Sequence, residues 1–436
     1  MTVTYHVGDT REVVASIPDG SVSLVACSPP FLALRSYLPA DHPLKDAEIG
    51  SEPDPATFLD TLLALTAEWG RVLAPWGSIA IELGDTYAGS GGAGGDYDTG
   101  MIRGGQNKFS GSALADRKNK VLNANGQRMQ QGDGWPLAKS LALIPQLYAA
   151  SLAYGRNLLT GRESPAGRWR VRNVIVWHRP NPAVGALGDK YRPSTSYIVV
   201  ATRSDKRWFD LTAVRTDHAY TRPSPPTPLK GEGGMESSVG NQAGRTYVNG
   251  GNPAGAPPLD CWFDAWDGSH DTWTVTTQPS SLAHYAMWPA KLAERLILSM
   301  CPAEVCTACG TPRRRMEKAD DAVREANRAM TGFATRDGRE AGGVPYSFRS
   351  PALTTLGWTD CGCGTGWTPG VVLDPFAGTF TTGCVAEFHG RDAIGIDIDS
   401  RNRDLWPMRK AEVFKSLNPT HVKVLDGQMD LFGGVA

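Results

Sequence analysis

A short segment near the amino terminus, VACSPPF, places two prolines and an aromatic residue directly after an apolar run. Pro29 and Pro30 fix the backbone and remove two amide donors, so carbonyl oxygens and the Ser28 hydroxyl remain as hydrogen-bond acceptors. Phe31 adds an aromatic face for stacking. These residue types form a rigid corner with few donors and an aromatic ring at its tip. Taken alone, however, the segment favours a simpler interpretation, in which the prolines end a strand and Phe31 fills the core.

A second segment, VVLDPFAGTFTTG, begins with an apolar strand over Val371–Leu373 that Asp374 ends. Gly378 permits a tight turn into a helix, and the next strand ends at Asp397. Such a unit is half of a nucleotide-binding sheet, in which an acidic residue about 20 positions further on grips a ribose. The segment lacks G-x-G-x-x-G, which argues against a pyrophosphate cofactor and for an adenosine ligand without phosphates. An acidic strand end followed by glycine is, without context, equally often a plain turn.

Four of the eight cysteines fall in two close pairs, Cys306-x-x-Cys309 and Cys361-x-Cys363, each followed by a glycine. Four thiolates in two pairs match the tetrahedral ligand set of a structural Zn²⁺. The first pair has the usual spacing, the second is one residue short, and Cys301 is an alternative ligand. A reduced cluster without metal is the competing interpretation.

The elements around these motifs alternate between strand and helix. Residues 2–31 are typical of strand, helix and strand, and a helix after Asp54 would place Leu62, Leu65, Trp69 and Leu73 on one face. We expect a further helix over 135–155 and strands over 169–180 and 195–203. This alternation predicts an α/β fold with a mostly parallel sheet and helices on its faces.

Composition bounds the function classes. The chain has 436 residues, 41% of them hydrophobic, and a formal net charge of −1, which predicts two or three domains without general attraction to nucleic acid. It shows neither a signal peptide nor an apolar run of about 18 residues, so we expect a cytoplasmic protein without a membrane partner. A local basic patch lies within residues 101–139, which contain seven Lys and Arg residues but only two Asp residues.

Together, the two ends of the chain resemble the amino-directed DNA methyltransferases. The chain carries, in this order, HVGD, SPPF, RNVIVWHRPNP, DTWTVTTQPSSLAHYAMWPAKLAERLILSMCP and VLDPFAGTFTTG. This is the permuted order called the β arrangement, in which the catalytic motif comes before the cofactor motif. The resemblance implies a Rossmann-like, S-adenosylmethionine-dependent fold that methylates the exocyclic amino group of a base flipped out of double-stranded DNA. In this family Ser at the first motif position is commoner in cytosine-N4 enzymes and Asp in adenine-N6 enzymes. Ser28 therefore favours cytosine, with adenine as the alternative.

The resemblance also implies roles for individual residues. The catalytic corner would comprise Ser28, Pro29, Pro30 and Phe31. The cofactor would be contacted by Asp9 at the adenine edge, Asp374 and Phe376 at the methionine part, Gly378 and Thr379 in the connecting loop, and Asp397 at the ribose. Asp9 has an equally plausible role as a turn cap. His284, in the segment that closes over the methionine end, also belongs to the expected cofactor-binding residues, where we expect a structural role rather than that of a base. Phe380-Thr381 departs from a common Gly-Thr.

The same resemblance divides the chain into seven expected parts. They are the catalytic half 1–87, a flexible basic insert 88–134, a continuation of the methyltransferase domain 135–210, a Pro/Gly-rich insert 211–272, a cofactor-closing segment 273–300, a zinc-ribbon-like insert 301–369 and the cofactor-binding half 370–436. Base recognition is expected in 88–134 or 211–272.

Two other classes of function stay open from the sequence. Related Pro-Pro corners serve RNA and protein amino groups, so the substrate could belong to either class. A catalytically inactive DNA-binding protein is the other alternative, although Ser28, Phe31, Asp374 and Asp397 are all present. The sequence also leaves open the oligomeric state and whether a cognate restriction enzyme, in a phage or host defence setting, accompanies the protein.

Overall fold

The structure is a computed structural model that describes residues 1–34, 37–38, 41–89, 134–179, 191–215, 288–319 and 353–417. The chain divides into two compact units. One comprises residues 1–213, 259–314 and 360–436, and the other comprises 214–258 and 315–359. Within the described residues, no helix is both long and apolar enough to cross a membrane.

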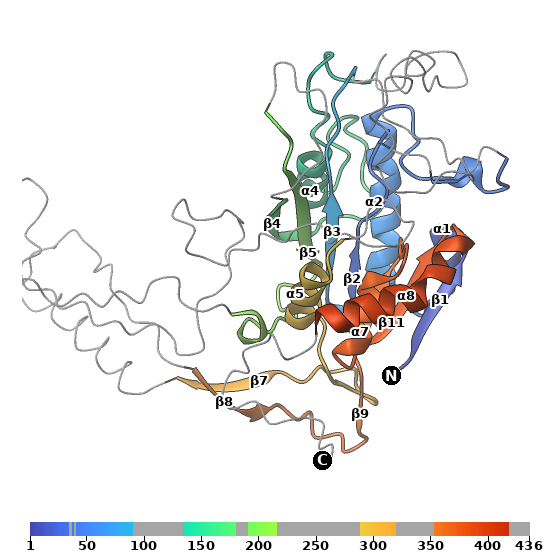
Figure 1. Ribbon diagram of the computed structural model, residues 1–436. Helices are drawn as coiled ribbons and strands as arrows, with labels where there is room; N and C mark the ends of the chain where they lie inside the picture. Colours follow the sequence, from blue (N-terminus) through green and yellow to red (C-terminus); the bar gives the residue numbers. More distant parts are fainter. Residues whose placement is uncertain are drawn as a thin grey trace, which may run out of the picture. The chain divides into compact units, whose positions relative to one another are not determined.

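The larger unit is built on a seven-stranded sheet (Figure 1). Its spatial order is β1 (Val3–Val7), β11 (Asp392–Asp397), β10 (Val371–Asp374), β2 (Val22–Cys27), β3 (Leu73–Leu83), β5 (Thr195–Thr202) and β4 (Arg170–His178). The first five strands are parallel, and β5 runs antiparallel to both of its neighbours. The expected α/β architecture with a mostly parallel sheet is therefore confirmed.

The two ends of the chain interleave in this sheet. The carboxyl-terminal strands β10 and β11 insert between β1 and β2, so that Val371–Asp374 lies beside the strand that leads into SPPF. The strand order changes direction at β10, because β11 follows on one side while β2 and β3 extend on the other. In open α/β sheets ligands bind at such a point, beyond the carboxyl ends of the strands.

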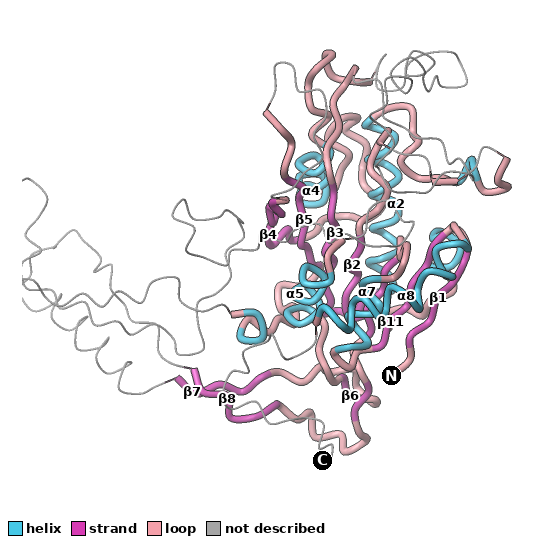
Figure 2. The backbone as a smooth tube through the Cα atoms, viewed as in Figure 1, coloured by secondary structure: helices cyan, strands magenta, loops and turns pink. Residues whose placement is uncertain are grey.

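Helices cover both faces of the sheet, as Figure 2 shows. One face carries α1 (Thr10–Ala15), α2 (Pro55–Val72) and α4 (Ile144–Tyr154), and the other carries α5 (Ala290–Met300), α7 (Thr381–Phe388) and α8 (Ser400–Ser416). Side chains of β2 alternate between the two cores: Val25 and Cys27 join the first, and Leu24 and Ala26 the second. A strand buried on both faces explains the continuous apolar run before SPPF.

Short elements complete the described residues. In the larger unit they are the 3₁₀ turn η1 (Lys45–Ala47) and the strand pair β6 (Val305–Cys306) and β9 (Trp367–Thr368). The 3₁₀ turn η3 spans Thr212–Val214. In the smaller unit β7 (Arg315–Ala319) pairs antiparallel with β8 (Leu353–Trp358).

The expected helices are confirmed in one case and corrected in another. Asp54 caps α2 by accepting a hydrogen bond from the Thr57 amide at 2.9 Å, and Leu62, Leu65 and Trp69 are buried. Leu73 is buried too, but it begins β3. The prediction of one helix over 135–155 was wrong for its first nine residues, because α4 begins only at Ile144. Its start is fixed by Asp85, which accepts from the amides of residues 143 and 144.

Candidate active site

Polar side chains gather where the parallel strands end. Asp9 follows β1, Asp397 ends β11, Asp374 ends β10, and Ser28 follows β2. The same edge carries Glu82, the penultimate residue of β3. The fold thus brings SPPF and DPFAG, which lie at opposite ends of the sequence, to neighbouring strands.

Ser28 donates a short hydrogen bond from Oγ to Oε2 of Glu82. Glu82 is only 3% exposed, and burial raises the pKa of its carboxyl group. Neighbouring hydroxyls, Ser28 among them, and the charge of Arg179 oppose this shift by favouring the ionised form. A Ser28 hydroxyl that donates to Glu82 keeps its oxygen lone pairs available to accept from a substrate.

Glu82 was missed by the sequence reasoning, although a signal was present. In SIAIELGD it is the one charged residue inside an apolar strand. A carboxylate at a buried strand position needs a partner or a function. Its partner is the hydroxyl of the candidate catalytic serine.

Phe31 is half-buried and its ring lies against the backbone of Gly84. A Cβ placed on Gly84 would come within 2.4 Å of the ring, so no larger residue fits there without moving Phe31. Pro29 is buried, and Pro30 and Ser28 are half-buried. The backbone of this corner is therefore held in place, and the Phe31 ring is partly accessible rather than wholly enclosed in the core.

Two carboxyl groups, the buried Asp374 and the half-buried Asp397, flank the loop after β10. Burial raises the pKa of Asp374 to about 7, and the charge of Asp397 adds to the shift. Burial likewise raises the pKa of Asp397 to about 6, against hydrogen bonds from the amides of Asp399 and Gly378. The Gly378 amide donates to Asp397 Oδ2 at 2.8 Å, and Asn402 Nδ2 donates to Oδ1 at 3.0 Å. Asp397 thus holds the cofactor-side loop directly.

The loop between β10 and α7 contains an unsatisfied polar atom. Gly378 adopts a positive φ of 52°, and its carbonyl accepts from the Tyr5 hydroxyl at 2.7 Å. Thr379 is 1% exposed, and its Oγ1 has no hydrogen-bond partner among the described residues. A buried hydroxyl without a partner is costly, and a bound polar ligand would satisfy it.

Phe380 departs from the family pattern in a way that the structure explains. Its φ of 62° places a non-glycine residue in the left-handed region, where glycine is usual. The ring is fully buried against two glycines: a Cβ on Gly383 or Gly395 would approach it to 2.3 or 2.7 Å. Tyr5 and Trp406 pack on the same ring, each with a centroid separation of 5.6 Å. This packing compensates for the strained backbone.

The remaining cofactor candidates have visible structural partners. Phe376 is half-buried and packs edge-on against Trp69, with ring centroids 6.4 Å apart. Asp9 caps α1 by accepting from the Arg11 amide and also pairs with the Arg11 guanidinium at 2.6 Å. Its capping role is therefore seen, and the adenine contact stays a prediction. His284 lies outside the described residues.

The four paired cysteines come together at the amino ends of the strands, opposite the end that carries Ser28. The sulfurs of Cys306, Cys309, Cys361 and Cys363 all lie within 4.8 Å of one another. Backbone N–H groups of Cys309 and Ala308 donate to the Cys306 sulfur and lower the pKa of its thiol to about 6. Cys301 lies outside this cluster and is buried.

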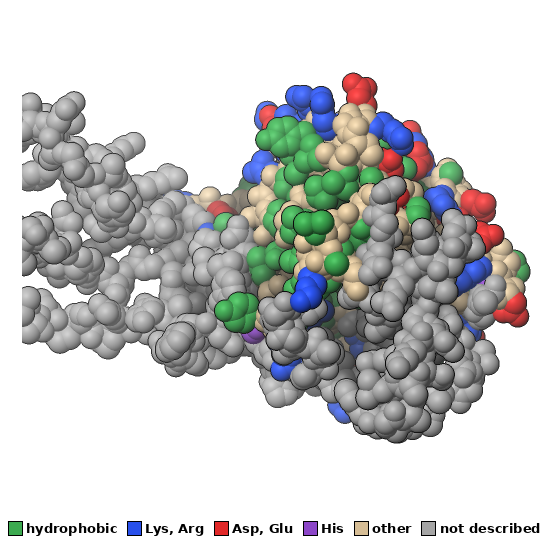
Figure 3. Space-filling view, turned by 90° about the horizontal axis from the view of Figure 1, so that it is seen from above, with side chains coloured by type: hydrophobic (Ala, Val, Ile, Leu, Met, Phe, Trp, Pro, Cys, Tyr) green, Lys and Arg blue, Asp and Glu red, His purple; other side chains and the backbone are tan. Residues whose placement is uncertain are grey.

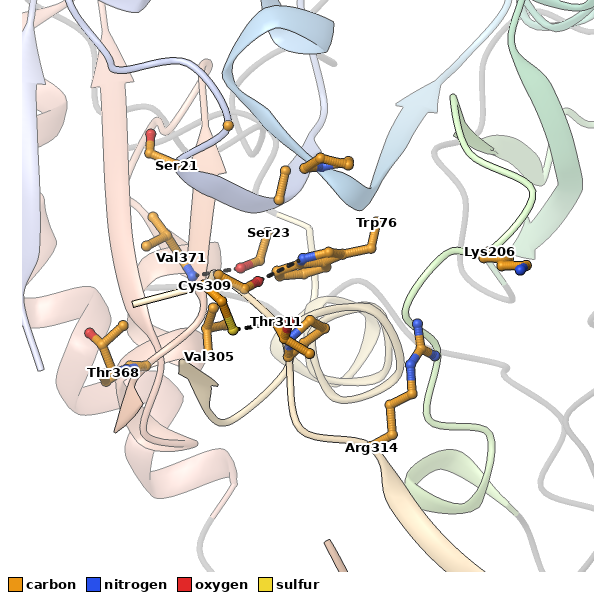
Figure 4. Close-up of a pocket in the computed structure, with 16 residues that line it drawn as sticks. Ser21, Ser23, Trp76, Lys206, Val305, Cys309, Thr311, Arg314, Thr368 and Val371 are labelled. Carbon is orange, nitrogen blue, oxygen red and sulfur yellow. Dashed lines mark hydrogen bonds between the residues drawn. The ribbon is translucent and has the colours of Figure 1, made fainter. Parts of the chain in front are cut away.

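A groove of about 560 Å³ adjoins this cluster (Figure 4). It is lined by Ser23 from the start of β2, Val371 from the start of β10, and Cys309. The Trp76 indole crosses it and donates to the Gly310 carbonyl at 3.0 Å. The cysteine cluster therefore docks on the amino ends of the strands, away from Ser28, which suits a structural role.

Comparison with known proteins identifies the family. Residues 22–304 and 368–405, more than half of the chain, match the sequence model of a family described as DNA methylase. The chain belongs to this DNA methylase family. The match includes the SPPF and DPFAG segments, so both motifs named by the sequence resemblance lie within it.

Two curated relatives of the DNA methylase are named Type II methyltransferases. M.SfiI of Streptomyces fimbriatus is 26% identical over 213 residues, which are 49% of this chain and 39% of the relative. M.Cfr9I of Citrobacter freundii is 25% identical over 296 residues, 68% of this chain and 72% of the relative. The chain thus spans less than half of M.SfiI and most of M.Cfr9I.

Solved structures also match the chain. The PvuII DNA methyltransferase (cytosine-N4-specific) is 13% identical, with a TM-score of 0.46 over 96% of this chain and 92% of its own. The M1.HpyAVI-SAM complex is 11% identical, with a TM-score of 0.36 over 94% of this chain and 100% of its own.

Proposed function

We propose that this DNA methylase transfers a methyl group to the exocyclic amino group of a base flipped out of duplex DNA, with cytosine N4 as the favoured target. The observation that supports this most directly is the hydrogen bond from Ser28 to Glu82 at the carboxyl ends of β2 and β3, beside the switch point at β10. Family membership and two relatives named Type II methyltransferases support the same reaction class. Adenine N6 is the alternative target.

The proposed chemistry follows from the weakness of the nucleophile. The lone pair of an exocyclic amino group is conjugated into the ring, so a site must polarise the N–H bonds with acceptors. Ser28 Oγ and the Pro29 carbonyl are the proposed acceptors, and Glu82 orients the Ser28 hydroxyl by accepting a hydrogen bond from it. Phe31 holds the base by stacking, and its contact with Gly84 fixes the plane of the ring. The neutral serine favours cytosine over adenine.

The residues at the cofactor loop fit S-adenosylmethionine. When bound, S-adenosylmethionine would supply a methyl group from its sulfonium centre: the S–CH3 bond breaks as the N–CH3 bond forms, the sulfonium becomes a neutral thioether, and the displaced amino proton passes to solvent. The unpartnered Thr379 hydroxyl, the buried Asp374 carboxyl group and the half-buried Asp397 carboxyl group provide polar contacts at the position where the sheet binds ligands. Asp374 would orient the methionine part and Asp397 the ribose.

Asp397→Ala is expected to weaken S-adenosylmethionine binding by roughly 1.5 to 3 kcal/mol, about tenfold to a hundredfold, through loss of charge-assisted hydrogen bonds. It also removes the acceptor that holds the Gly378 amide. Isothermal titration calorimetry measures the effect, and Asp404→Ala is the matched control because Asp404 is exposed on α8. An affinity unchanged by Asp397→Ala would remove this carboxylate from the binding site.

We further propose that the cysteine cluster holds one structural zinc ion. Thiolates are preferred zinc ligands. Four sulfurs within 4.8 Å of one another match one tetrahedral site. The metal would stabilise the β6–β9 pair and the turn that Trp76 contacts.

Purified protein is accordingly expected to contain about one zinc ion per chain. Cys306→Ser and Cys361→Ser should each lower that content, because each removes one of four ligands. Cys301→Ala should leave it unchanged, since Cys301 lies outside the cluster. Inductively coupled plasma mass spectrometry of protein prepared without chelators gives the measurement. Full zinc content in both ligand variants would contradict the site.

The class of substrate is tested by competition. We expect labelled methyl groups to pass from S-adenosylmethionine to double-stranded DNA, and unlabelled duplex DNA to compete while RNA of equal length does not. Transfer to RNA or to a protein in preference to DNA would replace the proposal by the corresponding alternative. Binding of DNA without any transfer, by protein that also fails to bind S-adenosylmethionine, would support an inactive DNA-binding protein.

A further inference from the structure

A turn over residues 137–140 stands beyond the carboxyl end of β3. The Ser140 amide donates to the Leu137 carbonyl at 3.0 Å and closes the turn. The turn is held against the continuation of β3 by two bonds of 2.8 Å, from the Lys139 amide to the Ala88 carbonyl and from the Ala88 amide to the Ser140 carbonyl. It therefore projects from the edge that carries Ser28 and Glu82.

The turn exposes apolar side chains to an unusual degree. Leu137 is 85% exposed, and Leu141 and Leu143 nearby are 39% and 48% exposed. Figure 3 looks onto the molecule from above the view of Figure 1 and shows hydrophobic side chains gathered on this face, with Lys and Arg among them. Exposed leucines in one short segment indicate a contact surface more than a single exposed leucine does.

The backbone of this segment is strained and firmly anchored. Lys139 and Leu143 have φ values of 73° and 59°, and the other described non-glycine residues with positive φ are Ala33 and Phe380. Ala33 and Phe380 follow β2 and β10 at the candidate active-site edge, where stored strain is typical of function. Anchors lie on both sides of the turn: Trp135 Nε1 donates to the carbonyl of residue 53 at 2.7 Å, and residue 142 donates to the carbonyl of residue 86 at 2.9 Å.

The position of the turn relative to Phe31 follows from the chain path. Gly84 contacts the Phe31 ring, and Ala88, four residues further on, forms backbone hydrogen bonds with the turn over residues 137–140. Four extended residues span at most about 13 Å, which is comparable to the width of the DNA major groove, about 12 Å. Ala88 and the turn bonded to it therefore lie within about one groove width of the Phe31 contact, within reach of a duplex that delivers a base to Phe31.

We propose that Leu137 is a wedge that enters the DNA base stack when the target base leaves it, an inference that rests on the proposed function. Flipping a base leaves a gap in the stack and costs unstacking energy. An apolar side chain inserted between base steps fills such a gap, and a side chain on a rigid turn does so without being ordered first. Leu137 thus acts as a positioning residue for the flipped base, with Lys139 on the same turn near the phosphates.

The test uses the full-length protein and two duplexes that contain its methylation site, determined beforehand by methylation-sensitive sequencing. In one duplex the target base is correctly paired, and in the other it is mismatched. Leu137→Ala is expected to slow single-turnover transfer about tenfold on the paired duplex, because the cost of unstacking the target base is then no longer offset by an inserted side chain. On the mismatched duplex, where the base is already unpaired, the rate should return to within about twofold of wild type.

Leu159→Ala is the matched control, because Leu159 is 46% exposed in the loop after α4 and lies at the other end of that helix from Asp85. It should change neither rate. Equal slowing of Leu137→Ala on both duplexes, or no slowing on the paired duplex, would overturn the wedge. Absence of transfer by the wild-type protein on either duplex would instead overturn the proposed function.

Discussion

Ser28→Ala is expected to slow methyl transfer by about a hundredfold, the order of effect seen when one preorganised hydrogen-bonding group is removed from an active site. The Ser28 oxygen accepts from the amino group most strongly as positive charge develops on its nitrogen, so the loss falls on the transfer step. The affinity for S-adenosylmethionine should not change, because its proposed contacts come from Thr379, Asp374 and Asp397.

Single-turnover transfer, measured beside calorimetric titration of the cofactor, separates these two quantities. Circular dichroism of the variant confirms that the fold is retained. Weaker cofactor binding with an unchanged transfer rate would contradict the assignment of Ser28 to the reacting base.

A double-mutant cycle extends this result to Glu82. Glu82→Gln keeps the shape of the side chain but removes the charge that orients the Ser28 hydroxyl. If the two residues act as one unit, the double variant should lose little more activity than Ser28→Ala alone. Additive losses would mean that Glu82 acts independently of Ser28.

The second large effect concerns Phe31. Phe31→Ala removes a stacking surface worth about 1 to 3 kcal/mol, so methyl transfer should fall by about tenfold to a hundredfold while cofactor affinity stays nearly unchanged. Gly84→Ala provides an independent test, because its Cβ would meet the Phe31 ring at 2.4 Å and force the ring to move. Both variants should lose transfer, although Gly84→Ala keeps the ring.

Phe209→Ala is the control for the loss of an aromatic ring. Phe209 is 37% exposed and stacks with Arg207, whose guanidinium carbon lies 4.3 Å from the ring centroid. Transfer at the wild-type rate by Phe31→Ala would show that this ring only packs the fold, and the flipped-base interpretation of SPPF would be wrong.

Strong local signals allowed most of the architecture to be predicted from the sequence. The apolar run before SPPF, the Asp374 strand end and the cap at Asp54 each follow from short-range chemistry, and each lies where expected. The two cysteine pairs were likewise recognisable, because ligand spacing is a local property.

Features that depend on contacts between residues distant in sequence could not be predicted from local sequence patterns. Glu82 became a site residue only when β3 was placed beside β2, and the start of α4 depends on Asp85, almost sixty residues earlier. The left-handed Phe380 is tolerated because two glycines, Gly383 and Gly395, make room for its ring. In each case the deciding partner comes from another element of the fold.

The most direct test of the account is the nucleoside composition of DNA from cells that express the protein. Liquid chromatography with mass spectrometry of digested DNA should reveal N4-methylcytosine with the wild-type chain and its near absence with Ser28→Ala at equal protein levels. N6-methyladenine in its place would correct the target base. DNA that carries no additional methylated base, from cells in which the folded protein binds S-adenosylmethionine, would contradict the central claim.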